Sequence, residues 1–109
     1  MQTDLAPRAD TALVSLVLQN RSHIEYKKVE IKKGFENTSS RKGKRMSGII
    51  CGKIEAGRPI SLFMKRFWQY PKEVSSKVLR VYKQGEKTFI ETISSVYEVL
   101  SYKEPAALN

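Results

Sequence analysis

The residues best suited to binding chemistry lie in segment 59–70. Read as a strand, this segment alternates its side chains between two faces, and Ile60, Leu62 and Met64 share the face that indicates core. The opposite face carries Ser61, Phe63, Lys65, Phe67 and Gln69. A lysine between aromatic rings can pair with phosphate while the rings stack on bases. The alternative is that both rings are buried, with the lysine reaching out between them.

A second candidate is a cluster of positive charge in the polar segment 37–45. Four of its last five residues are cations: Arg41, Lys42, Lys44 and Arg45. Their charges repel one another unless a polyanion gathers them, so we expect these residues to follow the phosphates of a nucleic acid. The alternative interpretation is a solvated run of charge that binds nothing.

The chain as a whole is basic. It has 20 Lys and Arg residues against 11 Asp and Glu residues, a net charge of +9 and a pI near 9.8. Such a charge favours polyanions, with nucleic acid first, then an anionic membrane or an acidic protein. Four further cations would widen the basic surface, and two further aromatic residues are reserves for stacking: Lys28, Lys32, Lys53 and Arg58, and Trp68 and Tyr82.

Catalytic and metal-binding groups are sparse. His23 is the only histidine and Cys51 the only cysteine, and their separation in the sequence predicts neither a Cys–His nucleophile nor a zinc site. The two aspartates, Asp4 and Asp10, lie near the N-terminus, and the glutamates suggest no metal site or acid–base pair. We therefore expect a protein that is not an enzyme and that uses no metal and no cofactor, with His23 as an exposed turn residue.

The expected location is the cytoplasm. A single cysteine cannot form an internal disulfide, and the N-terminal segment lacks the basic leader and the long apolar run of a secretion signal. No segment reaches the roughly 20 apolar residues that a membrane-spanning helix needs. We therefore expect no membrane partner.

One β-rich nucleic-acid-binding domain is expected over residues 11–104, between a loose arm at 1–10 and a short tail at 105–109. Pro71 at a first helical position predicts a short helix over 71–78. Apolar runs and alternation predict strands at 11–19, 24–35, 46–54 and 59–70. In the second of these, the inner face would hold Val29 and Ile31, and the outer row Lys28, Glu30 and Lys32.

The last third of the chain allows two interpretations. Residues 78–83 and 87–93 flank Gln84-Gly85-Glu86, a short connection that is typical of a hairpin. The helical spacing of the apolar residues leaves a helix over 87–102 as the alternative, although the β-branched residues and the paired serines favour strands. The predicted fold is mainly β, a small OB-like barrel or curved antiparallel sheet with one short helix. The alternative is an α+β fold with the C-terminal helix.

Residues 85–100 resemble the closing strand of bacterial and phage single-stranded-DNA-binding proteins of the OB-fold type. In that family a Gly-x-Lys turn leads into an aromatic or aliphatic pair, a glutamate, and then spaced Val and Leu. The matching positions are Gly85, Lys87, Phe89, Ile90, Glu91, Val96 and Leu100. These are mainly scaffold positions, so the resemblance implies a barrel that coats single strands and assigns no base-contacting residue. The chain ends without that family's acidic tail, so recruitment of repair partners is not implied.

Together, these features predict non-catalytic binding of single-stranded nucleic acid, with DNA favoured over RNA, through the basic loop and the aromatic and basic strand face. The alternative is a protein-interaction module, such as a phage or mobile-element product that binds an acidic host protein. Exposed edges of a small sheet also make a homodimer a plausible partner.

Overall fold

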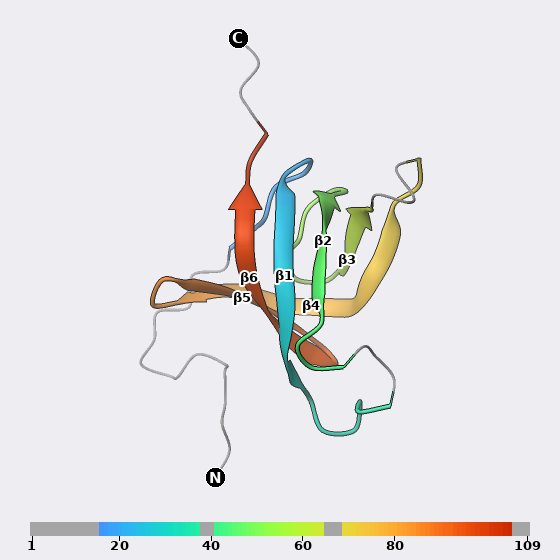
Figure 1. The fold of residues 1–109 in the computed structure, drawn as a ribbon, viewed down its shortest axis with the longest axis vertical. Coiled ribbons are helices and arrows are strands. Elements are labelled where there is room, and N and C mark those ends of the chain that lie inside the picture. Colours follow the sequence, from blue (N-terminus) through green and yellow to red (C-terminus); the bar gives the residue numbers. More distant parts are fainter. Residues whose placement is uncertain (1–15, 38–40, 65–68, 106–109) are drawn as a thin grey trace.

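A computed structural model of the 109-residue chain describes residues 16–37, 41–64 and 69–105. These residues form six strands in sequence order (Figure 1). The strands are β1 (His23–Ile31), β2 (Arg45–Ile50), β3 (Pro59–Phe63), β4 (Lys72–Gln84), β5 (Lys87–Thr92) and β6 (Ser95–Lys103). Each pairs antiparallel with the next, and β6 returns to pair with β1, which closes the barrel. The described residues contain no helix, so the predicted small β-barrel is confirmed in an all-β form.

The C-terminal third forms strands, and the alternative with a terminal helix is excluded. In the predicted hairpin, Gln84 ends β4 opposite Lys87, and Gly85 has a φ of +65°. Glycine at the first central position is what a type II′ hairpin turn requires. Ser94 lies in the turn after β5 and Ser95 begins β6, so the paired serines mark a strand boundary.

The predicted helix at 71–78 is wrong, because β4 covers all but the first of these residues. β3 pairs with this segment and places Ser61 opposite Glu73. The Ser75 hydroxyl also accepts a hydrogen bond of 2.9 Å from the backbone amide of Ile60. Pairing with β3 therefore overrides the local helix signal of a proline at a first helical position.

Four predicted strands differ in extent from those observed, and the second of them, 24–35, is shorter because β1 ends at Ile31. Of segment 11–19, residues 16–19 are described, and they contribute one isolated bridge, from Leu18 to Ile54. The segment 46–54 stops early, because β2 ends at Ile50. Segment 59–70 is shorter as well: β3 ends at Phe63, and residues 65–68 lie outside the described part.

Large apolar side chains from all six strands fill the barrel. The predicted core face is confirmed, since Ile60 and Leu62 are 0% exposed and Met64 packs against the same cluster. The rest of this main core consists of Leu18, Ile24, Tyr26, Ile50, Ile54, Val78, Val81, Ile90 and Tyr97. A smaller cluster consists of Tyr82, Phe89 and Val96, with Val29 packed against it.

The predicted faces of β1 are wrong. Ile24, Tyr26 and Lys28 are the buried residues of this strand, so Lys28 points inward and does not belong to an outer row. The pairing with β6 shifts register between Lys28 and Glu30, which leaves Val29 as an extra residue. Such a bulge breaks the strict alternation on which the prediction depended.

Tyr26 lies in the main core with an unsatisfied hydroxyl group. Its side chain is 0% exposed, and among the described residues its hydroxyl oxygen has no hydrogen-bond partner. Its ring meets that of Tyr97 edge to face, with 5.1 Å between the centroids. Burial, and to a lesser degree the neighbouring Tyr97, raises the pKa of the Tyr26 hydroxyl, which therefore stays neutral.

We expect Tyr26→Phe to raise the free energy of unfolding by about 1 kcal/mol, because a buried hydroxyl without a partner costs about 1 to 3 kcal/mol. Denaturant unfolding of the variant and the parent measures this difference. The matched control is Tyr97→Phe, which removes a hydroxyl that is hydrogen-bonded with Ser95 and should lower stability. A loss of stability in Tyr26→Phe would show that the hydroxyl has a partner in solution.

Candidate functional site

The loop between β1 and β2 presents its cations on an ordered turn. The Lys44 amide donates a hydrogen bond of 3.3 Å to the Arg41 carbonyl, and Gly43 inside the turn has a φ of +93°. Positive φ at the third position is typical of a type II turn and favours glycine there. Two more backbone bonds tie the turn to β1: the Gly43 amide donates to the Lys28 carbonyl at 2.7 Å, and the Lys28 amide to the Lys44 carbonyl at 3.0 Å. The backbone therefore fixes where these cations emerge.

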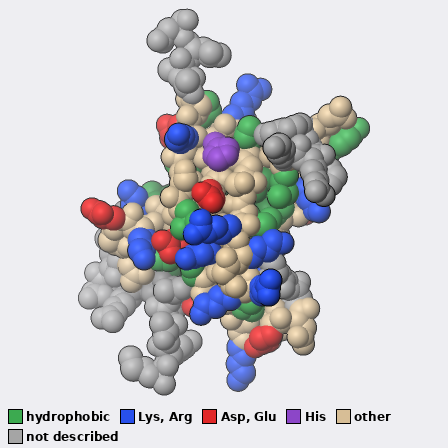
Figure 2. Space-filling model, in the orientation of Figure 1, with side chains coloured by type: hydrophobic (Ala, Val, Ile, Leu, Met, Phe, Trp, Pro, Cys, Tyr) green, Lys and Arg blue, Asp and Glu red, His purple; other side chains and the backbone are tan. Residues whose placement is uncertain are grey.

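We call Arg41, Lys42 and Lys44 the turn cations. All three are exposed, and with Gly43 they line a shallow, open hollow. Figure 2 shows Lys and Arg side chains gathered on the face that β1 and β2 present. Within the described ranges no turn cation forms an ion pair, whereas five other cations do: Lys32, Arg45, Arg58, Arg80 and Lys87. Among the described residues, the turn therefore holds positive charge that no ion-paired carboxylate offsets, and such charge favours phosphate binding.

Lys28 supports the turn from inside. Its side chain is 1% exposed, and its Nζ lies 5.5 Å from the centroid of the Tyr97 ring, a cation–π arrangement. Burial, and then the charge of Lys44, lowers the pKa of the Lys28 ammonium group. A side chain at this depth does not reach a nucleic-acid backbone, so the prediction of Lys28 as a surface contact is wrong. It adds positive charge beneath the turn instead.

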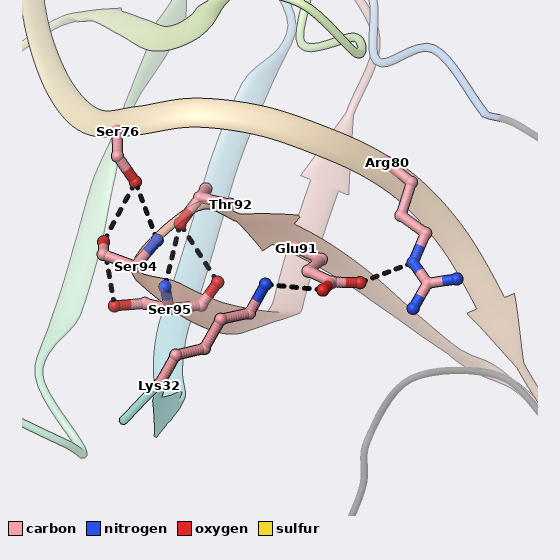
Figure 3. A network of polar contacts seen from close by, with 7 residues as sticks. All are labelled: Lys32, Ser76, Arg80, Glu91, Thr92, Ser94 and Ser95. Atoms are coloured by element: carbon pink, nitrogen blue, oxygen red, sulfur yellow. Dashed lines mark hydrogen bonds and ion pairs between the residues drawn. The ribbon is translucent and has the colours of Figure 1, made fainter. Parts of the chain in front are cut away.

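Lys32 is engaged in an ion triad with Glu91 and Arg80 (Figure 3). Lys32 Nζ lies 2.6 Å from Glu91 Oε2, and Arg80 Nε donates a hydrogen bond to Glu91 Oε1. Burial by itself would raise the pKa of the Glu91 carboxyl, but the hydrogen bonds and charges of Lys32 and Arg80 outweigh it and lower the pKa. Lys32 is therefore committed to a carboxylate rather than presented to a ligand.

Four hydroxyl side chains beside the triad hold the turn between β5 and β6, as Figure 3 shows. The Ser76 hydroxyl accepts a bond of 3.1 Å from the Ser94 amide and lies 2.9 Å from the Ser94 hydroxyl. The Thr92 hydroxyl donates to the Ser95 carbonyl and accepts from the Ser95 amide, each at 3.0 Å. These bonds join the turn to β4 and satisfy its polar groups, so the network is structural.

The other predicted cations are divided between the two ends of β2. Arg45 begins β2 beside the turn cations, and its guanidinium lies 3.8 Å from the Glu25 carboxylate. Lys53 and Arg58 are exposed beyond the far end of β2, where Arg58 pairs with Glu55 at 3.3 Å. Six strand residues span roughly 20 Å. Lys53 and Arg58 therefore do not form one patch with the turn cations.

The residues predicted to stack on bases, and the lysine among them, differ in how far they are buried and in whether the structure describes them. Phe63 is half-buried at the end of β3. Tyr82 is 1% exposed, and its ring stacks on Phe89 with 5.5 Å between centroids, so the prediction of Tyr82 as a reserve for base stacking is wrong. The three remaining residues, Lys65, Phe67 and Trp68, lie outside the described residues, and their roles stay predictions.

Sequence reasoning missed a row of side chains across four strands. His23 on β1 lies opposite Lys103 on β6 and opposite Ile49 on β2, and Ile49 lies opposite Phe63 on β3. Directly opposed residues point to the same side of a sheet, and the residues next to His23, Ile49 and Phe63 on their strands are core residues, so this row faces outward. We call it the outer row. Alternation along each strand can indicate which residues point outward. It cannot show that residues from four distant segments lie side by side.

The described residues include no group of three His, Cys, Asp or Glu side chains that could hold a metal ion. That part of the chain also has no helix long and apolar enough to cross a membrane. Comparison of the chain with protein-family models, with curated proteins and with solved structures gave no match.

Proposed function

We propose that this protein binds single-stranded nucleic acid without catalysis, and that the turn cations are its main phosphate contacts. One observation carries the proposal. Three exposed cations stand on one turn that backbone hydrogen bonds fix to β1, and within the described residues none of them has an ion-pair partner. Neutralising phosphates with such cations releases counterions, which supplies most of the affinity of a non-specific binder.

The surroundings of the turn support the same proposal. Lys28 adds a positive charge from below, and the net charge of +9 favours polyanions over the whole surface. Arg45 follows the turn, and its pair with Glu25 is solvent-exposed. An exposed ion pair contributes only about 0 to 1 kcal/mol, so Arg45 can exchange this carboxylate for a phosphate at small cost.

The barrel agrees with the resemblance only in being a small closed β-barrel. Its six strands pair in sequence order, whereas the OB-fold has five strands in a Greek-key arrangement. The residues that resemble single-stranded-DNA-binding proteins of the OB-fold type take scaffold positions here: Gly85 in the hairpin turn, Phe89 and Ile90 in the core clusters, and Glu91 in the ion triad. The preference for DNA over RNA rests on this resemblance alone.

The proposal predicts steep salt dependence that requires the turn. With about four phosphate contacts, the slope of log K against log salt should be near minus 3 for single strands, at about 0.7 per contact. Replacing Arg41, Lys42, Lys44 and Arg45 together by serine should remove most of that slope. The melting temperature should hardly change, because exposed charges contribute little to folding. Fluorescence anisotropy of a labelled oligonucleotide at several salt concentrations measures the slope.

A matched control removes the same charge elsewhere, by changing Lys53, Lys77, Lys83 and Lys87 to serine. All four are exposed, and none lies on the turn. Equal losses in the two variants would mean that net charge, and not the turn, determines binding. A flat salt response in the parent would remove the electrostatic basis of the proposal. Binding to polyglutamate as tightly as to the oligonucleotide would favour the alternative, a module for acidic proteins.

A further inference from the structure

We infer that the outer row is a base-binding platform, on which His23 and Phe63 each stack on one base of a single strand. This inference rests on the proposed function and adds to it the part of the surface that reads bases rather than phosphates. It also assigns a role to the only histidine of the chain, which the sequence predicted to be an exposed turn residue; the structure shows it exposed but at the start of β1, so the predicted turn is wrong.

The register of the sheet places the two rings at a suitable spacing. His23 and Phe63 stand on β1 and β3, opposite the same residue of β2, Ile49. Adjacent strands lie about 4.8 Å apart, so the two ring-bearing positions are roughly 10 Å apart. This spacing leaves room for one base on each ring, with the aliphatic Ile49 side chain between them. In sheet-based RNA-binding domains, aromatic side chains on the surface of the sheet stack on bases of a single strand.

The chemistry of the row fits a nucleotide. His23 is exposed, while Ile49 and Phe63 are half-buried, so the row combines one exposed ring with a partly exposed apolar surface. Lys103 is exposed and lies opposite His23 on β6, where it can pair with a phosphate beside the first base. A row kept only for the packing of the fold would have no need of an exposed imidazole and ammonium at one end.

The position of the row also matches that of the turn cations. Lys27 on β1 lies opposite Arg45, which follows the turn. His23 lies on the same strand, four residues before Lys27. This distance is roughly 13 Å along the strand. One nucleic-acid strand that crosses the sheet along the outer row and then turns to follow β1 can therefore place bases on the row and phosphates on the turn.

The test compares two labelled strands of equal length and equal phosphate number. One is oligothymidine, and the other has abasic sites at its central positions. The parent should bind oligothymidine more tightly, because only that strand offers bases for stacking. His23→Ala and Phe63→Ala should each weaken binding of oligothymidine by about 5- to 150-fold, the range for losing one base–aromatic stack, and leave the abasic strand unaffected.

Two further variants sharpen the comparison. His23→Phe keeps a ring at the position and should retain most of the preference for oligothymidine. Leu79→Ala removes an exposed apolar side chain of β4, 46% exposed and outside the row, and should change neither affinity. If Phe63→Ala unfolds, the two substitutions at the exposed His23 still decide the question.

The outcomes separate the two proposals. Salt-dependent binding of both strands with equal affinity, or equal losses on both strands in His23→Ala, would overturn the platform and leave the phosphate contacts standing. Failure of the parent to bind either strand would overturn both. Loss confined to oligothymidine, together with retention in His23→Phe, supports the platform.

Discussion

Leu62→Ala is expected to lower the free energy of unfolding by about 2 to 5 kcal/mol, the usual cost of a large-to-small change in a core. Leu62 lies on β3, and its side chain is 0% exposed inside the barrel. The substitution leaves a cavity that the closed sheet can collapse only in part. A domain of this size has about 5 to 15 kcal/mol of stability, so the loss should be plain in denaturant unfolding.

The next residue in the sequence provides the matched control. Phe63 is larger than Leu62, but it is half-buried and belongs to the outer row. We therefore expect Phe63→Ala to cost less stability than Leu62→Ala, although it removes more atoms. If Phe63→Ala unfolds as readily as Leu62→Ala, the ring is core, and the platform inferred for the outer row loses one of its two aromatic members.

Glu91→Ala is expected to cost about 2 to 3 kcal/mol of folding free energy. The Glu91 side chain is 12% exposed and holds both Lys32 and Arg80, which are 24% and 32% exposed. Breaking a fully buried pair costs about 3 to 5 kcal/mol, and the partial exposure of the two cations reduces this value. Removing the carboxylate leaves the Lys32 ammonium group, just after β1, and the Arg80 guanidinium on β4 without the anion that they share.

The same group predicts how stability depends on pH. The pKa of Glu91 is lower in the folded protein than the usual value of about 4.3 in an unfolded chain. Its contribution to stability is therefore fully present above the unfolded pKa and is lost as the pH falls through the folded pKa. Urea midpoints measured from pH 7 downwards should converge for the parent and Glu91→Gln in acid. Parallel curves would contradict the assignment.

Glu98→Gln is the control for this prediction. Glu98 lies on β6 and pairs with Lys87 at 3.9 Å, but Lys87 is 65% exposed. Exposed pairs contribute about 0 to 1 kcal/mol, so Glu98→Gln should shift the urea midpoint little at neutral pH. A similar loss in both variants would mean that general carboxylate charge, and not the triad, supplies the stability.

Local patterns in the sequence predicted the features that depend on neighbouring residues. Alternation identified the core face of β3, and the glycine of the connection at 84–86 identified the β4–β5 hairpin. The helix expected at 71–78 failed because its signal, a proline at a first helical position, is weak compared with pairing to a neighbouring strand. The inward direction of Lys28 was missed because one bulged residue, Val29, changes the parity of β1.

The candidate site was only partly predictable for a related reason. The turn cations are consecutive in the sequence apart from one glycine, so a charge count found them. The partners of Lys32 and Tyr82 were hidden, since a carboxylate 59 residues away neutralises Lys32 and a ring on the next strand covers Tyr82. The outer row combines residues 23, 49, 63 and 103, and no single segment of sequence shows that they meet.

The pairing of β1 with β6 also shapes how the barrel must assemble. His23 meets Lys103, so the two strands that close the barrel are separated by nearly the whole described sequence. Contacts of such high sequence separation form late, because the chain loses conformational entropy on closing a long loop before the new contact stabilises the fold. During synthesis, β1 leaves the ribosome early and stays without this partner until residue 103 has followed. The edge of β1 that pairs with β6 therefore stays open for that time, and the net charge of +9 disfavours pairing of such edges between chains.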